Sequence, residues 1–453
     1  MELKTSIVVS LATFCAVAVA GTQTSDAEDR AERHPIVRQS DSWFSLPPTR
    51  TACKMRRTAD GGWIQREIDR LASAGGGRVV VPAGVHATSY LRLRSHVELH
   101  LERGAVIRGA SDPDAYVDVP ADVCAITPEF SAKALILAWD AQDVAITGEG
   151  TIDCSGPGFY DHSTRIRGQD NFWSVPEKPR PRLAQLVRCR GVRLEGVTFR
   201  DSPAFTMYLR LCEDVTVRGI TVVGDQRMPN NDGLDFDGCR NVRIGESSFR
   251  TGDDCLVFRA IREKGDPTQV VCENVVVSNC TLHSLCQAIR IGCPSDDTIR
   301  NLRFENIRMD GINGIYFGNH AYCLREDDEG FLDVTDVVFS GVRGELTCSP
   351  LQILVDDGIR LRRVSGLVFR DFDVGGGMPV RFVGNARTAI GAISLEDFRA
   401  RLRVGEPLVL RGAREVSCNH VNLNGKTLPD GICPSEPGAT AQLRRRPSIC
   451  WEN

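Results

Sequence analysis

One short pattern recurs along most of this chain: a polar pair followed by alternating apolar residues. It reads Cys-Arg-Gly-Val-Arg-Leu from Cys189, and close copies begin at Cys212, Cys239 and Cys272. Weaker copies centre on apolar residues before and after these: Val97, Val144, Leu302, Val337 and Leu367. The central copies lie 23 to 35 residues apart, an irregular period that is typical of solenoids with variable loops.

A second set of strands repeats in step with the first. Each member holds two apolar residues separated by one position, so both side chains point the same way, into a core. The pairs are Met207/Leu209, Leu234/Phe236, Leu256/Phe258, Ile289/Ile291, Ile315/Phe317, Ile353/Val355 and Val380/Phe382. Two strand types per period predict an all-β fold, a right-handed, single-stranded parallel β-helix over residues 56–415.

The two ends of the chain differ from the repeat. Residues 63–71 have apolar residues at helical spacing and predict a short helix that caps the N-terminal end of the core. Residues 1–20 combine Lys4, an apolar run and a small-x-small ending, which predicts a signal peptide cleaved near Ala20 and a secreted protein, extracellular or periplasmic. Residues 21–55 are expected to be a linker, and residues 416–453 a Cys- and Pro-rich tail packed on the solenoid.

The cysteines fall into two groups. Cys189, Cys212, Cys239 and Cys272 hold the same place in successive coils, which favours a column of small buried thiols over halves of disulfides. Three cysteines lie in the tail, outside the repeat, and are better disulfide candidates: Cys418, Cys433 and Cys450. A long aromatic insertion, residues 155–186, is either one side of a binding cleft or a solvated loop.

The second repeat also aligns polar residues. Asp232 and Asp254 each lie two residues before a core leucine, so the register places them in one column. Gln287 and Asn313 continue that column, and Asp253 lies beside Asp254 at a glycine turn. Stacked carboxylates repel one another, and each raises the pKa of its neighbour. No fold requires such an arrangement. Acid–base hydrolysis of a glycosidic bond does use such a pair, whereas turn-capping aspartates and a calcium site are the competing interpretations.

Two of these segments resemble known motifs. Residues 229–235, Pro-Asn-Asn-Asp-Gly-Leu-Asp, are similar to the Asn-Thr-Asp-Gly-Ile-Asp motif of glycoside hydrolase family 28, the polygalacturonases and their relatives. Residues 251–255 resemble the family's Gly-Asp-Asp-Cys motif, and residues 202–205 its Ser-Pro-x-Phe segment. The resemblance covers roughly residues 60–400 and marks the chain as a divergent member.

The resemblance implies a hydrolase of pectin-like polysaccharides or oligosaccharides that inverts the anomeric centre in one step. Asp253 would be the general acid, and Asp232 and Asp254 would hold and activate water, with carboxyls roughly 6.5–9.5 Å apart across the bond. Asn230, in the same motif as Asp232, is expected to bind substrate together with Gln287 and Asn313.

Two family motifs are missing. Gln287 stands where the family's Gly-His-Gly motif has His, and a Gln cannot titrate. Residues 316–318, Tyr-Phe-Gly, stand where the Arg-Ile-Lys motif would clamp a uronate carboxylate. Arg290 and Arg259 are the candidate substitutes for that clamp. In the alternative interpretation, each is a solvated surface arginine.

Two other functions compete with hydrolysis. A polysaccharide lyase on the same fold would use Arg290 as its base, commonly with Ca²⁺, and a non-catalytic solenoid would bind carbohydrate without needing the acids. The net charge of −4 favours neither nucleic acid nor anionic membranes as a partner. We expect a monomer with a carbohydrate substrate and no cofactor or bound metal, since the histidines lack metal-ligand spacing.

Overall fold

The computed structural model describes residues 53–54, 61–120, 123, 133–166, 169–176, 179–263, 266, 268–320, 330–356, 359–385, 387–388 and 390–433. The expected signal peptide at 1–20 lies outside these residues, as do Cys450 and, apart from 53–54, the linker. No helix in the described part of the chain is long and apolar enough to cross a membrane.

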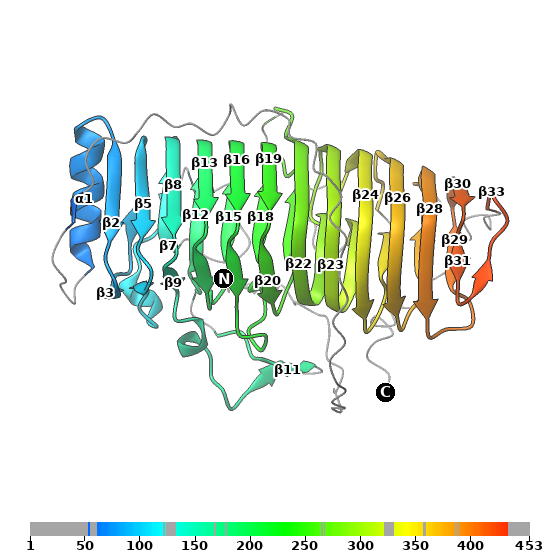
Figure 1. The fold of residues 1–453 in the computed structure, drawn as a ribbon, viewed down its shortest axis with the longest axis horizontal. Coiled ribbons are helices and arrows are strands. Elements are labelled where there is room, and N and C mark those ends of the chain that lie inside the picture. Colours follow the sequence, from blue (N-terminus) through cyan, green and yellow to red (C-terminus); the bar gives the residue numbers. More distant parts are fainter. Residues whose placement is uncertain are drawn as a thin grey trace, which may run out of the picture.

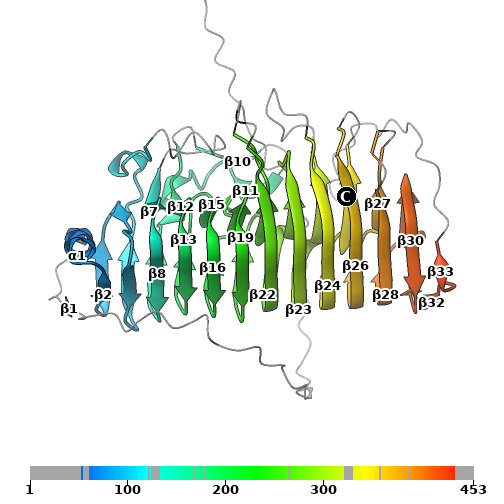
Figure 2. The same cartoon turned by 90° about the horizontal axis from the view of Figure 1, so that it is seen from above.

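The strands stack in chain order along one axis as a right-handed parallel β-helix (Figures 1 and 2), the hand that crossovers between parallel strands adopt. Pairing between coils divides them into three rows. The first row stacks the valines of the repeated Cys-Arg-Gly-Val-Arg-Leu pattern in one column, because Val192 pairs with Val215, Val215 with Val242, and Val242 with Val275. Its strands are β1 (Cys53–Lys54), β2 (Gly77–Val81), β5 (Val97–Leu101), β8 (Gln142–Gly148), β13 (Arg190–Glu195), β16 (Glu213–Arg218), β19 (Arg240–Gly245) and β30 (Ala413–Asn419).

The second and third rows complete each coil. The second row consists of β3 (Gly84–Ala87), β6 (Ala105–Arg108), β9 (Thr151–Asp153), β14 (Thr198–Arg200), β17 (Thr221–Val223), β20 (Ser248–Thr251) and β31 (Asn422–Leu423). The third row consists of β4 (Leu91–Arg92), β7 (Ala134–Trp139), β12 (Arg182–Val187), β15 (Met207–Arg210), β18 (Leu234–Asp237), β21 (Leu256–Arg259), β25 (Leu351–Val355), β27 (Val380–Val383) and β29 (Leu408–Arg411).

Later strands bend through more than one row. They are β22 (Val271–Gly292), β23 (Thr298–Asn319), β24 (Asp333–Leu346), β26 (Arg363–Gly376) and β28 (Ile390–Leu402). For example, β22 pairs with β19, β20 and β21 in turn, and so crosses all three rows. Inward side chains of every coil form one continuous apolar core.

The ends of the core are covered in different ways. Helix α1 (Gly62–Ser73) buries Trp63, Ile68 and Leu71 against the first coils, as the helical spacing predicted. Short 3-10 helices occur at Pro113–Ala115 and Gly156–Phe159. At the other end β33 (Gly431–Ile432) pairs antiparallel with β30, and β32 (Lys426–Thr427) with β31.

One cysteine was misplaced by the sequence pattern. Cys418, expected in a tail outside the repeat, lies in β30, which pairs with β28, so the stack continues past residue 415. The reason is that the last coils lack the polar-pair signature although they keep alternating apolar residues. Cys418 and Cys433 form a disulfide, in line with their being the better candidates.

The predicted thiol column is confirmed. Cys189, Cys212, Cys239 and Cys272 are free and buried, and the thiol of Cys212 donates to the carbonyl of Leu186 in the preceding coil at 3.5 Å. Burial raises the pKa of Cys212 and of Cys272 well above the ordinary range, so both stay protonated and weakly reactive.

We therefore expect these four thiols to resist an aromatic disulfide reagent in the native protein and to react after denaturation. Mass spectrometry of the labelled peptides measures this site by site. Rapid labelling of Cys212 in the folded protein would show that the column is open to solvent.

Candidate active site

The predicted polar column lies on the third row. Core pairing runs from Leu234 to Leu256, Ile289 and Ile315, which brings into register the residues two positions earlier: Asp232, Asp254, Gln287 and Asn313. Backbone bonds follow the same register, since Gly233 N donates to Asp254 O at 2.8 Å and Cys255 N to Gln287 O at 3.1 Å. The structure therefore brings these four predicted residues together on adjacent coils.

Asp253 is held by backbone donors. Its Oδ2 accepts from the backbone N of Asn230 at 3.1 Å, and the Nδ2 of Asn230 lies 3.5 Å from the same oxygen. Its Oδ1 accepts from the backbone N of Asp254 at 3.0 Å. Burial, followed by the charge of Asp254, raises the pKa of Asp253. Asp253 is therefore a carboxyl whose protonated form is favoured.

Asp254 has a full set of partners. Its Oδ1 accepts from the backbone N of Gln287 at 2.9 Å, and its Oδ2 forms a close ion pair with Nε of Arg290. Both side chains are largely buried, where an ion pair persists if its remaining polar atoms are satisfied. Asp254 thus has a dedicated cation, which Asp253 lacks.

Asp232 is the least satisfied of the three acids. It is buried, and its Oδ1 has no hydrogen-bond partner among the described residues. Burial, with the charges of Asp253, Asp235 and Asp254, raises the pKa of Asp232 well above its usual value. Leaving a buried acceptor without a donor costs free energy. Oδ1 of Asp232 is therefore an atom that can accept a hydrogen bond from water or from a ligand.

Two of the three acids, Asp253 and Asp254, are closer together than expected. An oxygen of Asp253 lies within 4.8 Å of one of Asp254, below the roughly 6.5–9.5 Å that an inverting pair spans. The expected separation is therefore wrong for this pair, because the two residues are neighbours on one turn. If water is activated across a bond from Asp253, that separation has to be provided by Asp232.

The glycines beside the acids are required by close packing. A Cβ on Gly233 would lie 2.3 Å from the carbonyl oxygen of Cys255, and one on Gly252 would lie 2.7 Å from that of Met228. Asn231 joins the two turns, because its Oδ1 accepts from the backbone N of Gly252 at 2.7 Å and of Asp253 at 3.1 Å. Sequence reasoning missed this role of Asn231, since the contact crosses coils and has no periodic signature.

Arg180 was also missed. Its Nη1 donates to the hydroxyl of Tyr160 at 2.7 Å and to the carbonyl of Pro229 at 2.9 Å, and its Nη2 donates to Oδ1 of Asn230 at 3.0 Å. Arg180 and Tyr160 are both buried. Tyr160 and Arg180 therefore anchor the described part of this insertion to the turn that carries Asp232, so the interpretation as a solvated loop is wrong for these two residues. In the sequence, the prolines on either side of Arg180 were the feature that could have pointed to its role.

Trp173 belongs to the same insertion, in β11 (Gln169–Trp173), which pairs with β10 (Arg165–Ile166) beside the stack (Figure 1). It is buried, and its ring stacks on His162 with the centroids 4.1 Å apart. This aromatic side chain supports the insertion and does not present an open face to a sugar.

Neither candidate clamp arginine is solvated. Arg259 is buried and its Nη2 lies 3.1 Å from Oδ1 of Asp235, and Arg290 pairs with Asp254 as described. The surface interpretation is wrong for both, because each arginine pairs with an aspartate of the preceding coil. Among the remaining predicted contacts, Gln287 Oε1 has no partner in the described part of the chain, whereas Asn313 Oδ1 accepts from Ser349 N at 3.3 Å.

The calcium interpretation fits this site poorly. Asp253, Asp254 and Cys286 could each direct one ligand atom to a common point, but a thiol is a soft ligand that Ca²⁺ does not prefer. In addition, Arg290 already compensates the charge of Asp254. The acids are therefore better explained as proton-transfer groups than as cation ligands.

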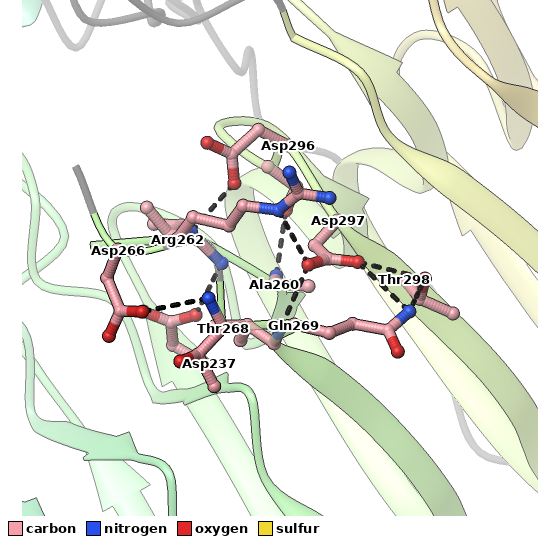
Figure 3. Close-up of polar contacts among 12 residues, drawn as sticks. Asp237, Ala260, Arg262, Asp266, Thr268, Gln269, Asp296, Asp297 and Thr298 are labelled. Carbon is pink, nitrogen blue, oxygen red and sulfur yellow. Dashed lines mark hydrogen bonds and ion pairs between the residues drawn. The ribbon is translucent and has the colours of Figure 1, made fainter. Parts of the chain in front are cut away.

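A second acidic cluster, which follows the third-row strands whereas the three acids precede them, is structural (Figure 3). Asp296 accepts from the backbone N of Arg262 at 2.7 Å, and Asp297 accepts from Nε of Arg262 at 2.8 Å and from the backbone N of Val270 at 2.9 Å. These bonds fix both ends of the segment that joins β21 to β22. Their carboxylates are fully used within the protein.

The raised pKa values of Asp232 and Asp253 predict a specific pH dependence of stability. A group whose pKa is higher in the folded than in the unfolded protein stabilises the fold at pH values below its pKa in the unfolded protein. This stabilisation is lost as the pH rises through its pKa in the folded protein. We expect the free energy of unfolding to fall as the pH rises above the ordinary carboxyl pKa of about 3.9, and to fall less in the Asp232→Asn/Asp253→Asn variant. Urea unfolding over a series of pH values tests this, and an equal fall of the unfolding free energy with pH in the two proteins would contradict it.

Comparison with known proteins agrees with the motifs. Residues 111–273, which include all three acids, match the family model described as glycosyl hydrolases family 28. The "Probable polygalacturonase" of Vitis vinifera is 29% identical over 248 residues, 53% of this chain and 49% of that protein. The chain thus matches about half the length of this curated relative.

Two solved structures share the fold. The hyperthermoactive exopolygalacturonase from Thermotoga maritima superposes with a TM-score of 0.65 at 21% identity, covering 86% of this chain and 93% of that one. The family 28 exopolygalacturonase from Yersinia enterocolitica gives 0.63 at 20% identity, covering 83% and 73%. The chain is therefore similar to glycosyl hydrolases family 28 over residues 111–273, and it shares the fold of two solved exopolygalacturonases at low sequence identity.

Proposed function

We propose that the chain is a secreted, monomeric glycoside hydrolase that cleaves glycosidic bonds in a pectin-like polysaccharide or oligosaccharide. The observation that carries the proposal is the charge arrangement of the site. Of the three buried carboxyls, Asp253 and Asp254 lie on one turn and Asp232 lies on the equivalent turn of the neighbouring coil. Arg290 compensates the charge of Asp254. Burial and mutual repulsion raise the pKa of both Asp232 and Asp253, so one of the two can hold a proton while the other is ionised.

In this proposal Asp253 carries the proton and donates it to the leaving oxygen of the glycosidic bond. Asp254, paired with Arg290, and Asp232 orient the attacking water, and Asp232 accepts a proton from that water on the side opposite Asp253. Attack from that side inverts the anomeric centre. Gln287 Oε1, which lacks a donor, would accept a hydrogen bond from a sugar hydroxyl.

A lyase is less well supported. It would need Arg290 as a base, but the charge of Asp254 raises the pKa of Arg290 further above its ordinary value, although burial opposes this. A guanidinium in that state cannot take up a proton from the carbon next to a carboxylate.

The test is incubation with defined pectic oligosaccharides, both free-acid and methyl-esterified. We expect new reducing ends without ultraviolet absorbance, and an inverted anomer as the first product by NMR. Ultraviolet-absorbing products that disappear on chelation would indicate a lyase. Binding without cleavage, unchanged by Asp253→Asn, would indicate a non-catalytic carbohydrate-binding solenoid.

A further inference from the structure

The outward column that contains Arg290 continues along the third row. Strand pairing places Tyr316 beside Arg290, Gln352 beside Tyr316, and Arg381 beside Gln352. Adjacent strands lie about 4.8 Å apart, so Arg381 is about 14 Å beyond Arg290 and about 19 Å beyond the coil of Asp254. This distance corresponds to several sugar units along the face that carries the acids.

Arg381 differs from the three arginines of the coils that carry the acids and their neighbours. Arg210, Arg259 and Arg290 each pair with an aspartate. Arg381 is half-buried, and its Nη2 donates to Oε1 of Gln352 at 2.5 Å. Its Nε has no hydrogen-bond partner, and no carboxylate among the described residues forms an ion pair with it.

A partly buried guanidinium without a counter-ion is unfavourable. Burial lowers the pKa of Arg381, and the neighbouring Tyr316 offsets this only in part. Leaving a cation desolvated and unpaired costs free energy that an anionic ligand would recover. A guanidinium presents a planar pair of donors that matches a carboxylate, and Gln352 holds the guanidinium in place at one edge.

We propose that Arg381, positioned by Gln352 beside Tyr316, is a subsite for the carboxylate of a uronic-acid unit, several units from the bond that is cut. The inference rests on the proposed hydrolysis of a pectin-like chain. It accounts for the absence of a uronate clamp next to the acids: Arg290 is committed to Asp254, and negative charge on the substrate is recognised farther along the same face.

The test is calorimetric binding in the Asp253→Asn background, which allows binding without turnover. The probes are a galacturonic-acid hexamer as free acid, its methyl ester, and the free-acid dimer. Arg381→Gln should weaken binding of the free-acid hexamer roughly ten- to a hundredfold, the effect of losing a charge-assisted hydrogen bond. Binding of the ester and of the dimer should not change.

Two further variants serve as controls. Arg401→Gln removes an exposed arginine that pairs with Glu345 and Asp373 on another face, and should bind both hexamers normally. Arg381→Lys keeps the charge without the planar fork, and should bind the free-acid hexamer with intermediate affinity. Without ligand, Arg381→Gln should melt at or above the parent temperature, because it removes an uncompensated cation.

The outcomes separate this inference from the proposed function. Equal weakening of both hexamers, no weakening, or a large fall in melting temperature would overturn the subsite. If the wild-type chain cleaves the free-acid hexamer and Arg381→Gln does so equally well, the subsite is wrong and the hydrolase stands. If binding depends on Arg381 but no cleavage occurs, the hydrolase is wrong and the subsite stands. If the hexamer is neither bound nor cleaved, both are wrong.

Discussion

Replacing Asp253 by Asn is expected to lower kcat by roughly 10²- to 10⁴-fold, the range for losing a positioned general acid or base. The substitution keeps the shape of the side chain and removes a carboxyl whose pKa is raised by burial. The variant should therefore fold and be at least as stable at neutral pH. Asp232→Asn and Asp254→Asn should also abolish most turnover, because each carboxylate is assigned a different step. Steady-state kinetics and circular dichroism measure both effects.

Asp371→Asn is the matched control. Asp371 is exposed and pairs with Arg343, in β26 and β24 on another part of the stack, so its loss should leave kcat unchanged. Near-normal turnover by any two of the three active-site variants would refute the assignment of the acids.

Replacing Arg290 by Gln is expected to lower both activity and stability. The change leaves Asp254 buried without its cation, and breaking one side of a buried pair costs about 3–5 kcal/mol. Turnover should fall by roughly 10²-fold or more, at the lower end of the range for an acid–base group. The loss should be equal on free-acid and methyl-esterified substrates, because Arg290 acts on Asp254 and does not contact the sugar's charge.

The double variant Arg290→Gln/Asp254→Asn provides the decisive comparison. It removes both charges, so most of the lost stability should return in urea unfolding, while activity should stay low. Arg370→Gln, which breaks an exposed pair with Glu396, should change neither quantity. A larger loss on free-acid than on esterified substrate in Arg290→Gln would instead show that Arg290 binds the carboxylate directly.

The fold and the acid column were predictable because both depend on period. The two inward residues of a strand set its register against the strands of the neighbouring coils. Asp232 and Asp254 therefore fall on one column once Leu234 and Leu256 are aligned. Packing of equivalent side chains on successive coils then leaves little freedom. For the same reason the valine and cysteine columns could be read directly from the repeat.

The connections between side chains were not predictable in this way. Arg180 reaches Asn230 from an insertion that has no place in the period, and Asn231 joins two turns through one amide oxygen. The pair between Arg290 and Asp254 crosses neighbouring coils, and its direction depends on rotamers that the repeat does not encode. The sequence therefore located the acids but missed the groups that hold them.

The stacking of coils also means that the molecule does not have to unfold as one unit. In such a linear array each coil is supported mainly by its two neighbours. The acids lie well inside the array, on the turns before β18 and β21, far from either end. Fraying that starts beyond β28 would release the last coils first, then β27 with Arg381, and only later the turns that carry Asp232 and Asp253. A shortened stack would then still contain its proton-transfer groups. It would lack Arg381, and with it the contact to a distant part of a long, charged substrate.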